Sequence, residues 1–140
     1  MKNIIFKIFL TLLLLQSPLL ANTQYFQDGL KFYNKKKLKK AKFKFEQDIV
    51  YNPKSELSYL YLSKIFKSLN KKDLEEQNLN TVILLNPKNE EAIYNLVKLK
   101  LENSDYKKSK ELNERLINLC DIFCNESKKL KIEIENLSKK

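Results

Sequence analysis

Few residues of this chain belong to the types that carry out chemistry. The 140 residues include no histidine, which removes the commonest general base and metal ligand. The only glycine is Gly29, so a glycine-rich phosphate-binding loop is excluded. Carboxylates cluster from Asp73 to Glu76 and at Glu90 and Glu91, early in expected helices, where acids stabilise the positive end of the helix dipole. We therefore expect no catalytic residue, no metal site, no cofactor and no small-molecule substrate, and so no enzyme.

Two cysteines, Cys120 and Cys124, are the remaining reactive side chains. Their spacing is wider than that of the usual zinc-binding or redox pairs. Residues four apart in a regular helix hold their Cβ atoms about 5 to 6 Å apart, whereas a disulfide needs roughly 3.5 to 4.5 Å. A disulfide can therefore form only if residues 121–123 turn, which the end of an expected helix permits. The alternative is a pair of buried apolar thiols.

Lysines concentrate in one stretch of the sequence. Residues 31–44 hold eight lysines and no acid, and the whole chain after residue 21 has a net charge of +8, because residues 1–21 contain two of the 27 basic residues and no acid. One interpretation is the solvated face of a helical hairpin. The other is a basic patch that binds an anionic membrane surface or an acidic protein. The patch comprises Lys35, Lys36, Lys37, Lys39 and Lys40.

The N-terminal residues predict export. Lys2 and Lys7 precede an apolar run from Ile8 to Leu15, and Pro18 then interrupts the pattern. This order is typical of a secretory signal peptide, with cleavage near Ala21 and delivery to the periplasm or cell envelope. The alternative is an uncleaved anchor, but the apolar stretch is shorter than the ~20 residues that a membrane-spanning helix needs. Export also separates the chain from nucleic acid, so we expect no nucleic-acid partner.

A period of 34 residues organises the rest of the chain. The tetrapeptide ending in Pro53-Lys54 recurs as the one ending in Pro87-Lys88, and each has an asparagine before the proline. The residue before a proline is pushed out of helical geometry, so both motifs end helices. No segment shows the sustained alternation of a strand. The expected helices cover residues 23–35, 38–51, 55–69, 72–85, 89–102 and 105–119.

The period and its pattern resemble the tetratricopeptide repeat (TPR) family. In that family, aromatic and small residues of a first helix are followed by an alanine and a phenylalanine of a second helix and then by a proline. The structural repeat positions that match are Gly29, Ala41, Phe45, Pro53, Ser63 and Pro87. Gly29 is expected to let the paired helix approach closely, with Ala41 opposite. Asp28 and Glu75 depart from the pattern, since leucine and alanine are usual at their places.

The resemblance implies an all-α solenoid in residues 22–140. It would contain about three helical hairpins, at residues 22–55, 56–89 and 90–123, and a capping helix at residues 125–140 that covers the open end. A signal peptide would occupy residues 1–21. The third copy is the loosest, because Asp121 stands where the proline would be.

The resemblance also implies a function. The first helices of TPR hairpins line a concave groove that holds a peptide or helix of a partner protein. Aromatics and lysines at these places suit an extended segment of acidic character. The competing interpretation is that Phe26 and Tyr94 only complete the packing of their hairpins. The residues projected onto the groove are Phe26, Leu30, Tyr33, Leu60, Lys64, Lys67, Tyr94, Lys98 and Leu101.

One TPR subfamily grips the terminal carboxylate of its partner with lysines and asparagines of the first groove helix. Phe26 and Leu30 occupy those places here, so we do not expect this clamp. The expectation is a non-catalytic interaction scaffold of the cell envelope that binds another protein. The alternative is peripheral membrane binding through the stretch from Lys31 to Lys44.

Overall fold

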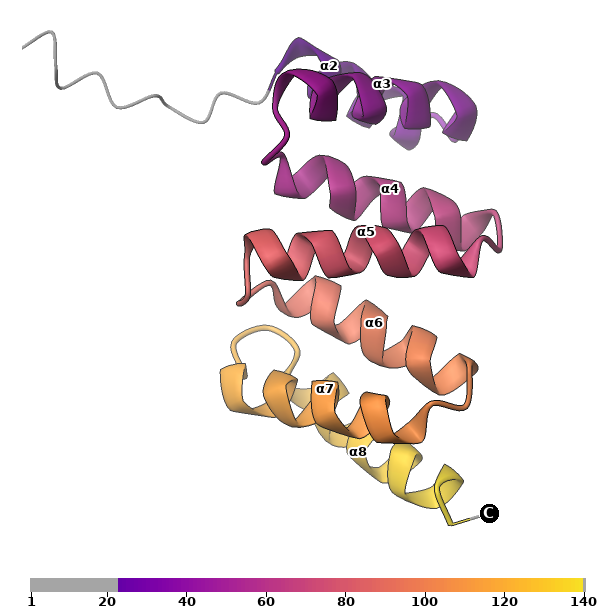
Figure 1. The fold of residues 1–140 in the computed structure, drawn as a ribbon, viewed down its shortest axis with the longest axis vertical. Coiled ribbons are helices and arrows are strands. Elements are labelled where there is room, and N and C mark those ends of the chain that lie inside the picture. Colours follow the sequence, from indigo (N-terminus) through magenta and orange to yellow (C-terminus); the bar gives the residue numbers. More distant parts are fainter. Residues whose placement is uncertain (1–22, 140) are drawn as a thin grey trace, which may run out of the picture.

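The computed structural model describes residues 23–139, and the expected signal peptide lies outside them. The regular elements of these residues are all α-helices, stacked in a row from α2 to α8 (Figure 1). The expected all-α fold class is confirmed, and every expected helix is found with small shifts of its ends. None of the described helices has the length and apolar character needed to cross a membrane. The helices are α2 (Gln24–Asn34), α3 (Leu38–Tyr51), α4 (Glu56–Ser68), α5 (Lys72–Leu85), α6 (Glu90–Glu102), α7 (Tyr106–Leu119) and α8 (Cys124–Leu137).

The turn inside each hairpin repeats with the period of the sequence. Lys36, Asn70 and Ser104 are 34 residues apart, and their φ angles are 58°, 53° and 59°. In the first turn, the backbone N–H of Lys37 donates to the carbonyl of Phe32 at 2.9 Å, and the two later turns have the equivalent bond at the same length. One left-handed residue of this kind ends a helix and reverses the chain. The backbone therefore carries the period independently of the side chains.

The two helices of the first hairpin cross at Gly29. A Cβ atom built at this position would lie 2.6 Å from Cε1 and 2.7 Å from Cδ1 of the Phe45 ring. Glycine is required here because any side chain would clash with that ring. The close approach expected at Gly29 is thus present. Ala41 is fully buried, as expected for a facing residue, but the atoms nearest to Gly29 belong to Phe45.

The second hairpin replaces the small pair of the first by Ser63 and Glu75, both of which are buried. The Ser63 hydroxyl donates to the carbonyl of Leu60 at 2.7 Å. The Glu75 carboxylate lies 4.0 Å from Nζ of Lys67. Burial raises the pKa of Glu75, the Lys67 ammonium opposes this, and the net effect is a pKa above the ordinary value. A long acidic side chain fits at an alanine position because its end reaches toward a lysine.

The core consists of two clusters that differ in composition. The first, between α2, α3 and α4, is built around Phe26, Phe45 and Phe66. The second extends from α4 to α8 and is mainly aliphatic, with Ile93 and Leu116 fully buried within it. Pro53 and Pro87 lie exposed in the turns that follow α3 and α5, where they end these helices as expected.

Candidate interaction groove

The first helices of successive hairpins, α2, α4 and α6, share one surface. Tyr61 of α4 packs edge-on against Tyr33 of α2, with ring centroids 5.1 Å apart. On the other side of α4, Lys64 forms a 2.7 Å ion pair with Glu91 of α6. These contacts join the three helices, and the faces that carry them are called the first-helix surface below.

Two of the nine residues projected onto the groove are buried. Phe26 is 2% exposed and packs against the rings of Phe45 and Tyr61, and Leu60 is 4% exposed within the aliphatic core. As contacts for a partner these two predictions are wrong, because neighbouring helices already cover both side chains. Leu30, Tyr33 and Leu101 also pack against the core but stay partly exposed.

The three projected lysines have different surroundings. Lys64 is held by Glu91, and its Nζ lies 4.8 Å from the centre of the Tyr61 ring. Lys67 is exposed, with the Glu75 carboxylate 4.0 Å away. Lys98 lies over the ring of Tyr94 at 5.8 Å, and no carboxylate of residues 23–139 forms an ion pair with it. Lys67 and Lys98 are therefore the projected cations best placed to meet an acidic group.

Tyr94 stacks on Phe123, with ring centroids 4.8 Å apart. Phe123 lies in the turn between α7 and α8 and lines a cavity of about 760 Å³, called the junction cavity below. The sequence gave no indication of this cavity, because the turn lacks the proline that marks the two earlier junctions. The cavity is lined by Leu57, Leu60, Lys88, Asn89, Glu90, Glu91, Leu119, Asp121, Ile122 and Phe123.

Glu90 fixes the turn that forms one wall of the junction cavity. Its carboxylate is buried and accepts the backbone N–H groups of Asp121, Ile122 and Phe123 at 2.6, 2.7 and 2.8 Å. Burial raises the pKa of Glu90, but the three N–H bonds together outweigh it and lower the pKa below its ordinary value. The expectation that Glu90 only stabilises a helix dipole is thus incomplete, although the residue does begin α6.

A disulfide joins Cys120 and Cys124 across the same turn. Cys120 has a left-handed backbone with φ of 36°, which ends α7 and lets residues 121–123 turn back. The two Cα atoms are therefore only 4.7 Å apart. Of the two alternatives drawn from the sequence, the disulfide is the one found, and the pair of buried thiols is wrong.

The lysines of the basic patch are all exposed around the turn between α2 and α3. Two large apolar side chains of α3 are exposed beyond them: Phe43 is 58% exposed and Val50 is 76% exposed. Lys40 lies 5.7 Å from the centre of the Phe32 ring. The patch is separate from the first-helix surface, since no residue belongs to both.

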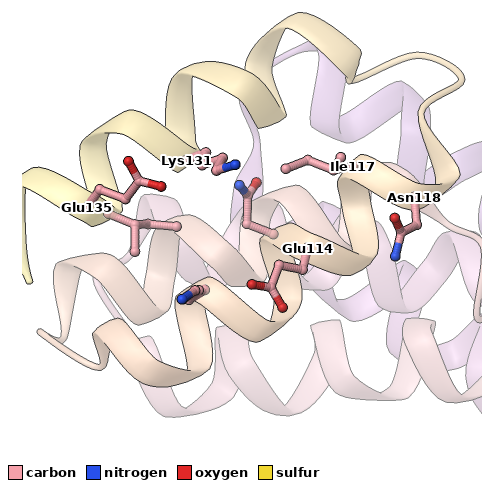
Figure 2. A pocket seen from close by; sticks show the side chains of 8 residues that line it. Glu114, Ile117, Asn118, Lys131 and Glu135 are labelled. Carbon is pink, nitrogen blue, oxygen red and sulfur yellow. The ribbon is translucent and has the colours of Figure 1, made fainter.

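A second hollow of about 330 Å³ lies between α7 and α8. Figure 2 shows Glu114, Ile117 and Asn118 on α7 and Lys131 and Glu135 on α8. Lys131 is one further period beyond the Gly29 and Ser63 positions, where the earlier hairpins receive their second helix. A lysine at this place would prevent another helix from packing closely, so the polar lining is that of a solenoid end.

Among residues 23–139, no group of histidine, cysteine, aspartate and glutamate side chains has the arrangement of a metal site. The carboxylates with shifted pKa values, Glu75 and Glu90, are both engaged by their own neighbours in the fold. The arrangement is therefore suited to contact with another molecule through side chains of the first-helix surface.

No protein-family model matches the chain, and no curated protein matches its sequence. Solved structures do match its fold. The first TPR domain of Spaghetti (RPAP3), bound to an HSP90 peptide, has a TM-score of 0.67 and 15% identity, with 82% of this chain and 88% of that chain covered. The Yersinia enterocolitica type III secretion chaperone SycD, in complex with a peptide of the translocator YopD, has a TM-score of 0.71 and 14% identity, with 82% and 90% covered.

A third solved structure, the Sgt2 TPR domain from Aspergillus fumigatus, has a TM-score of 0.71 and 17% identity, with 89% of this chain and 85% of that chain covered. At such identities the likeness concerns the fold. Together with the period of 34 residues in both side chains and backbone, it shows that residues 23–139 form a tetratricopeptide-repeat solenoid.

Proposed function

We propose that this protein is a non-catalytic scaffold that holds a peptide or helix of a partner protein on the first-helix surface. The observation that carries the proposal is the exposure of Lys67 and Lys98 beside the aromatic rings of Tyr33, Tyr61 and Tyr94 on adjoining helices. Aromatic side chains supply apolar contact area, and unpaired lysines select an acidic segment.

Two of the similar structures support this proposal. The RPAP3 domain was solved with an HSP90 peptide, and SycD was solved with a peptide of YopD. The same solenoid therefore holds short segments of other proteins in those cases. The proposal extends this use of the fold to the present chain, without the carboxylate clamp that Phe26 and Leu30 make unsuitable.

We further propose that the scaffold works in the periplasm or cell envelope. The expected signal peptide is the first argument. The second is the Cys120–Cys124 disulfide, because such bonds persist in oxidising compartments outside the cytosol. N-terminal sequencing of the protein recovered from an envelope fraction tests this: a chain that begins near Asn22 supports export, and an intact Met1 contradicts cleavage.

The groove is tested by affinity capture from an envelope extract, followed by titration of the captured partner. Replacing Tyr33 and Tyr94 by alanine should weaken binding at least about thirtyfold, since loss of aromatic anchors costs about 2 kcal/mol or more. Both rings also pack within the fold, so a thermal melt of the variant must accompany the titration. Lys98→Glu is a second variant that leaves the core intact and should also weaken an acidic partner.

A second candidate function is binding to an anionic membrane surface through the basic patch. Phe43 and Val50 favour it, because exposed apolar side chains beside lysines can enter the headgroup region of a bilayer. Binding to vesicles of anionic phospholipid should then vanish at high salt. Groove binding with apolar contacts should largely persist, so the salt dependence separates the two functions.

A further inference from the structure

Two exposed aliphatic side chains line the junction cavity from opposite elements. Leu57 belongs to the first turn of α4 and is 41% exposed, and Ile122 belongs to the turn between α7 and α8 and is 75% exposed. Leu60 and Phe123 contribute buried and half-buried apolar surface between them. Single exposed apolar residues are common on proteins, but two that line one cavity with an apolar base form a place for an apolar side chain.

The wall that carries Ile122 is held in place by three separate contacts. The Cys120–Cys124 disulfide closes the turn, Glu90 accepts three consecutive backbone N–H groups, and Phe123 stacks on Tyr94 of α6. Ile122 is therefore presented on a fixed backbone. A preformed wall lowers the entropy lost when a ligand binds.

The charges around the junction cavity are mainly acidic. Lys88, Glu90, Glu91 and Asp121 line it, so one cation faces three anions. Glu90 is engaged by the turn and Glu91 pairs with Lys64, which leaves Asp121 as the exposed anion. By contrast, Lys67 and Lys98 lie near the opposite ends of α4 and α6. The first-helix surface is thus acidic near the cavity and basic at its other end.

We propose that the junction cavity is the anchor site for a partner peptide and sets the direction in which it binds. The cavity takes one large aliphatic or aromatic side chain that has a basic or neutral residue beside it. An acidic part of the same segment lies against Lys67 and Lys98. This inference rests on the proposed groove function and adds the position of the anchor and the orientation of the ligand.

The test uses a displayed library of random peptides of about 12 residues, which can span ~40 Å when extended. The library is selected against the protein as the cell processes it, and one enriched peptide is synthesised with a fluorophore for titration. The expected peptides carry a large apolar residue next to lysine or arginine, with aspartate or glutamate several residues away. A scrambled peptide of the same composition serves as the ligand control.

Two variants with matched exposure decide the position of the anchor. Ile122→Asp should weaken the selected peptide at least about tenfold, since it places a charge in an apolar contact. Val50→Asp is the control: Val50 is 76% exposed but lies on α3, away from the cavity, and its substitution should leave the affinity unchanged. Cys124→Ser should also weaken binding, because the wall loses one of its constraints.

The outcomes separate this inference from the proposed function. If Ile122→Asp binds the peptide as the parent does, but Lys98→Glu and Tyr33→Ala lose it, the groove function stands and the anchor site is wrong. If none of these variants changes the affinity, or the library yields no enriched peptide, both are overturned. Weaker binding by Ile122→Asp with unchanged binding by Val50→Asp supports the anchor site.

Discussion

The two ends of the hairpins are built in different ways. The turns inside the hairpins lie along one edge of the solenoid and the junctions between repeats lie along the other (Figure 1). Each turn has the same backbone bond and one left-handed residue, although the residue changes from Lys36 to Asn70 to Ser104. Each junction instead depends on a particular carboxylate, and the donors that surround it differ from one junction to the next.

The carboxylates of the junctions are Asp48, Glu56 and Glu90. Asp48 is fully buried and accepts the hydroxyl groups of Thr23, Ser55 and Ser58. Glu56 accepts the side-chain amides of Asn86 and Asn89. Glu90 accepts three backbone N–H groups. A turn made only of backbone tolerates sequence change, whereas a junction should fail when its one acid is lost.

The largest effect is expected for Glu90→Ala. Three buried N–H groups lose a charged acceptor, so the free energy of unfolding should fall by about 3 kcal/mol. Urea denaturation followed by circular dichroism measures this. The matched control is Glu91→Ala, whose carboxylate is partly exposed and pairs with Lys64, and it should cost less than about 1 kcal/mol. Equal losses for the two variants would contradict the assigned role of Glu90.

The next largest effect is expected for Asp48→Ala, at about 2 kcal/mol of unfolding free energy. Its donors are hydroxyl groups, which can rotate toward other acceptors, so the loss should be smaller than at Glu90. Asp48→Asn keeps one acceptor oxygen and should lie between the parent and Asp48→Ala. A larger loss at Asp48 than at Glu90, in the same urea titration, would reverse the comparison of the two junctions.

Removal of the disulfide should have a further, smaller effect. Replacing Cys120 and Cys124 by serine should lower the unfolding free energy by about 1 to 2 kcal/mol, because the loop that the bond closes is short. Thermal melts of the parent and the double variant, each with and without reductant, measure this. Reductant should destabilise only the parent, and a parent that is insensitive to reductant would show that the bond adds nothing to this junction.

The pH dependence sharpens the comparison further. The pKa of Glu90 is lower in the folded chain than its ordinary value, so its stabilising contribution is complete above that value and is lost as the pH falls through the folded pKa. Glu75 has the opposite sign, since its raised pKa favours the fold in acid and the advantage is lost as the pH rises through it.

The measurement is the urea midpoint of the parent and of Glu90→Gln across acidic pH. The difference between the two should be full near neutral pH and should shrink in acid below the ordinary glutamate pKa. A difference that is constant over the whole range would show that the charge of Glu90 is not what holds the junction.

The smallest effect is expected in a turn. Lys36→Gly should raise the unfolding free energy by about 0.5 kcal/mol, because glycine adopts a positive φ without the strain that lysine has there, although it also loses more entropy on folding. Asn70→Gly is the matched comparison and should gain less, since asparagine tolerates this conformation. Differential scanning calorimetry checks both, and a destabilised Lys36→Gly would mean that the lysine side chain itself supports the turn.

The helices could be predicted from the sequence because their signals are local. Asn52-Pro53 and Asn86-Pro87 end helices wherever they occur, and Gly29 marked a close crossing that the structure contains. The small-residue pattern also located Ala41 in the core, although it did not indicate that the Phe45 ring would be the nearest neighbour of Gly29.

The candidate site was predicted less completely. Helical register placed Tyr33, Lys67 and Lys98 on the right helices, but it could not show that neighbouring helices cover Phe26 and Leu60. The donors to Asp48 and Glu90 come from other elements, so spacing along one helix carries no signal for them. Ile122 and Phe123 lie in a turn without a repeat signature. Only the recurrence of an acid at Glu56 and Glu90, one period apart, could have indicated the junctions.

The contact between Glu90 and the last turn has a consequence for how the solenoid opens. Terminal helices of repeat arrays normally fray first, because each has a neighbour on one side only. Here the first residue of α6 holds the backbone that leads into α8, so α8 cannot detach until that contact at the base of the third hairpin is released. The amide hydrogens in the first turns of α8 should therefore exchange with solvent together with those at the start of α6, and fraying should be confined to the C-terminal turns of α8.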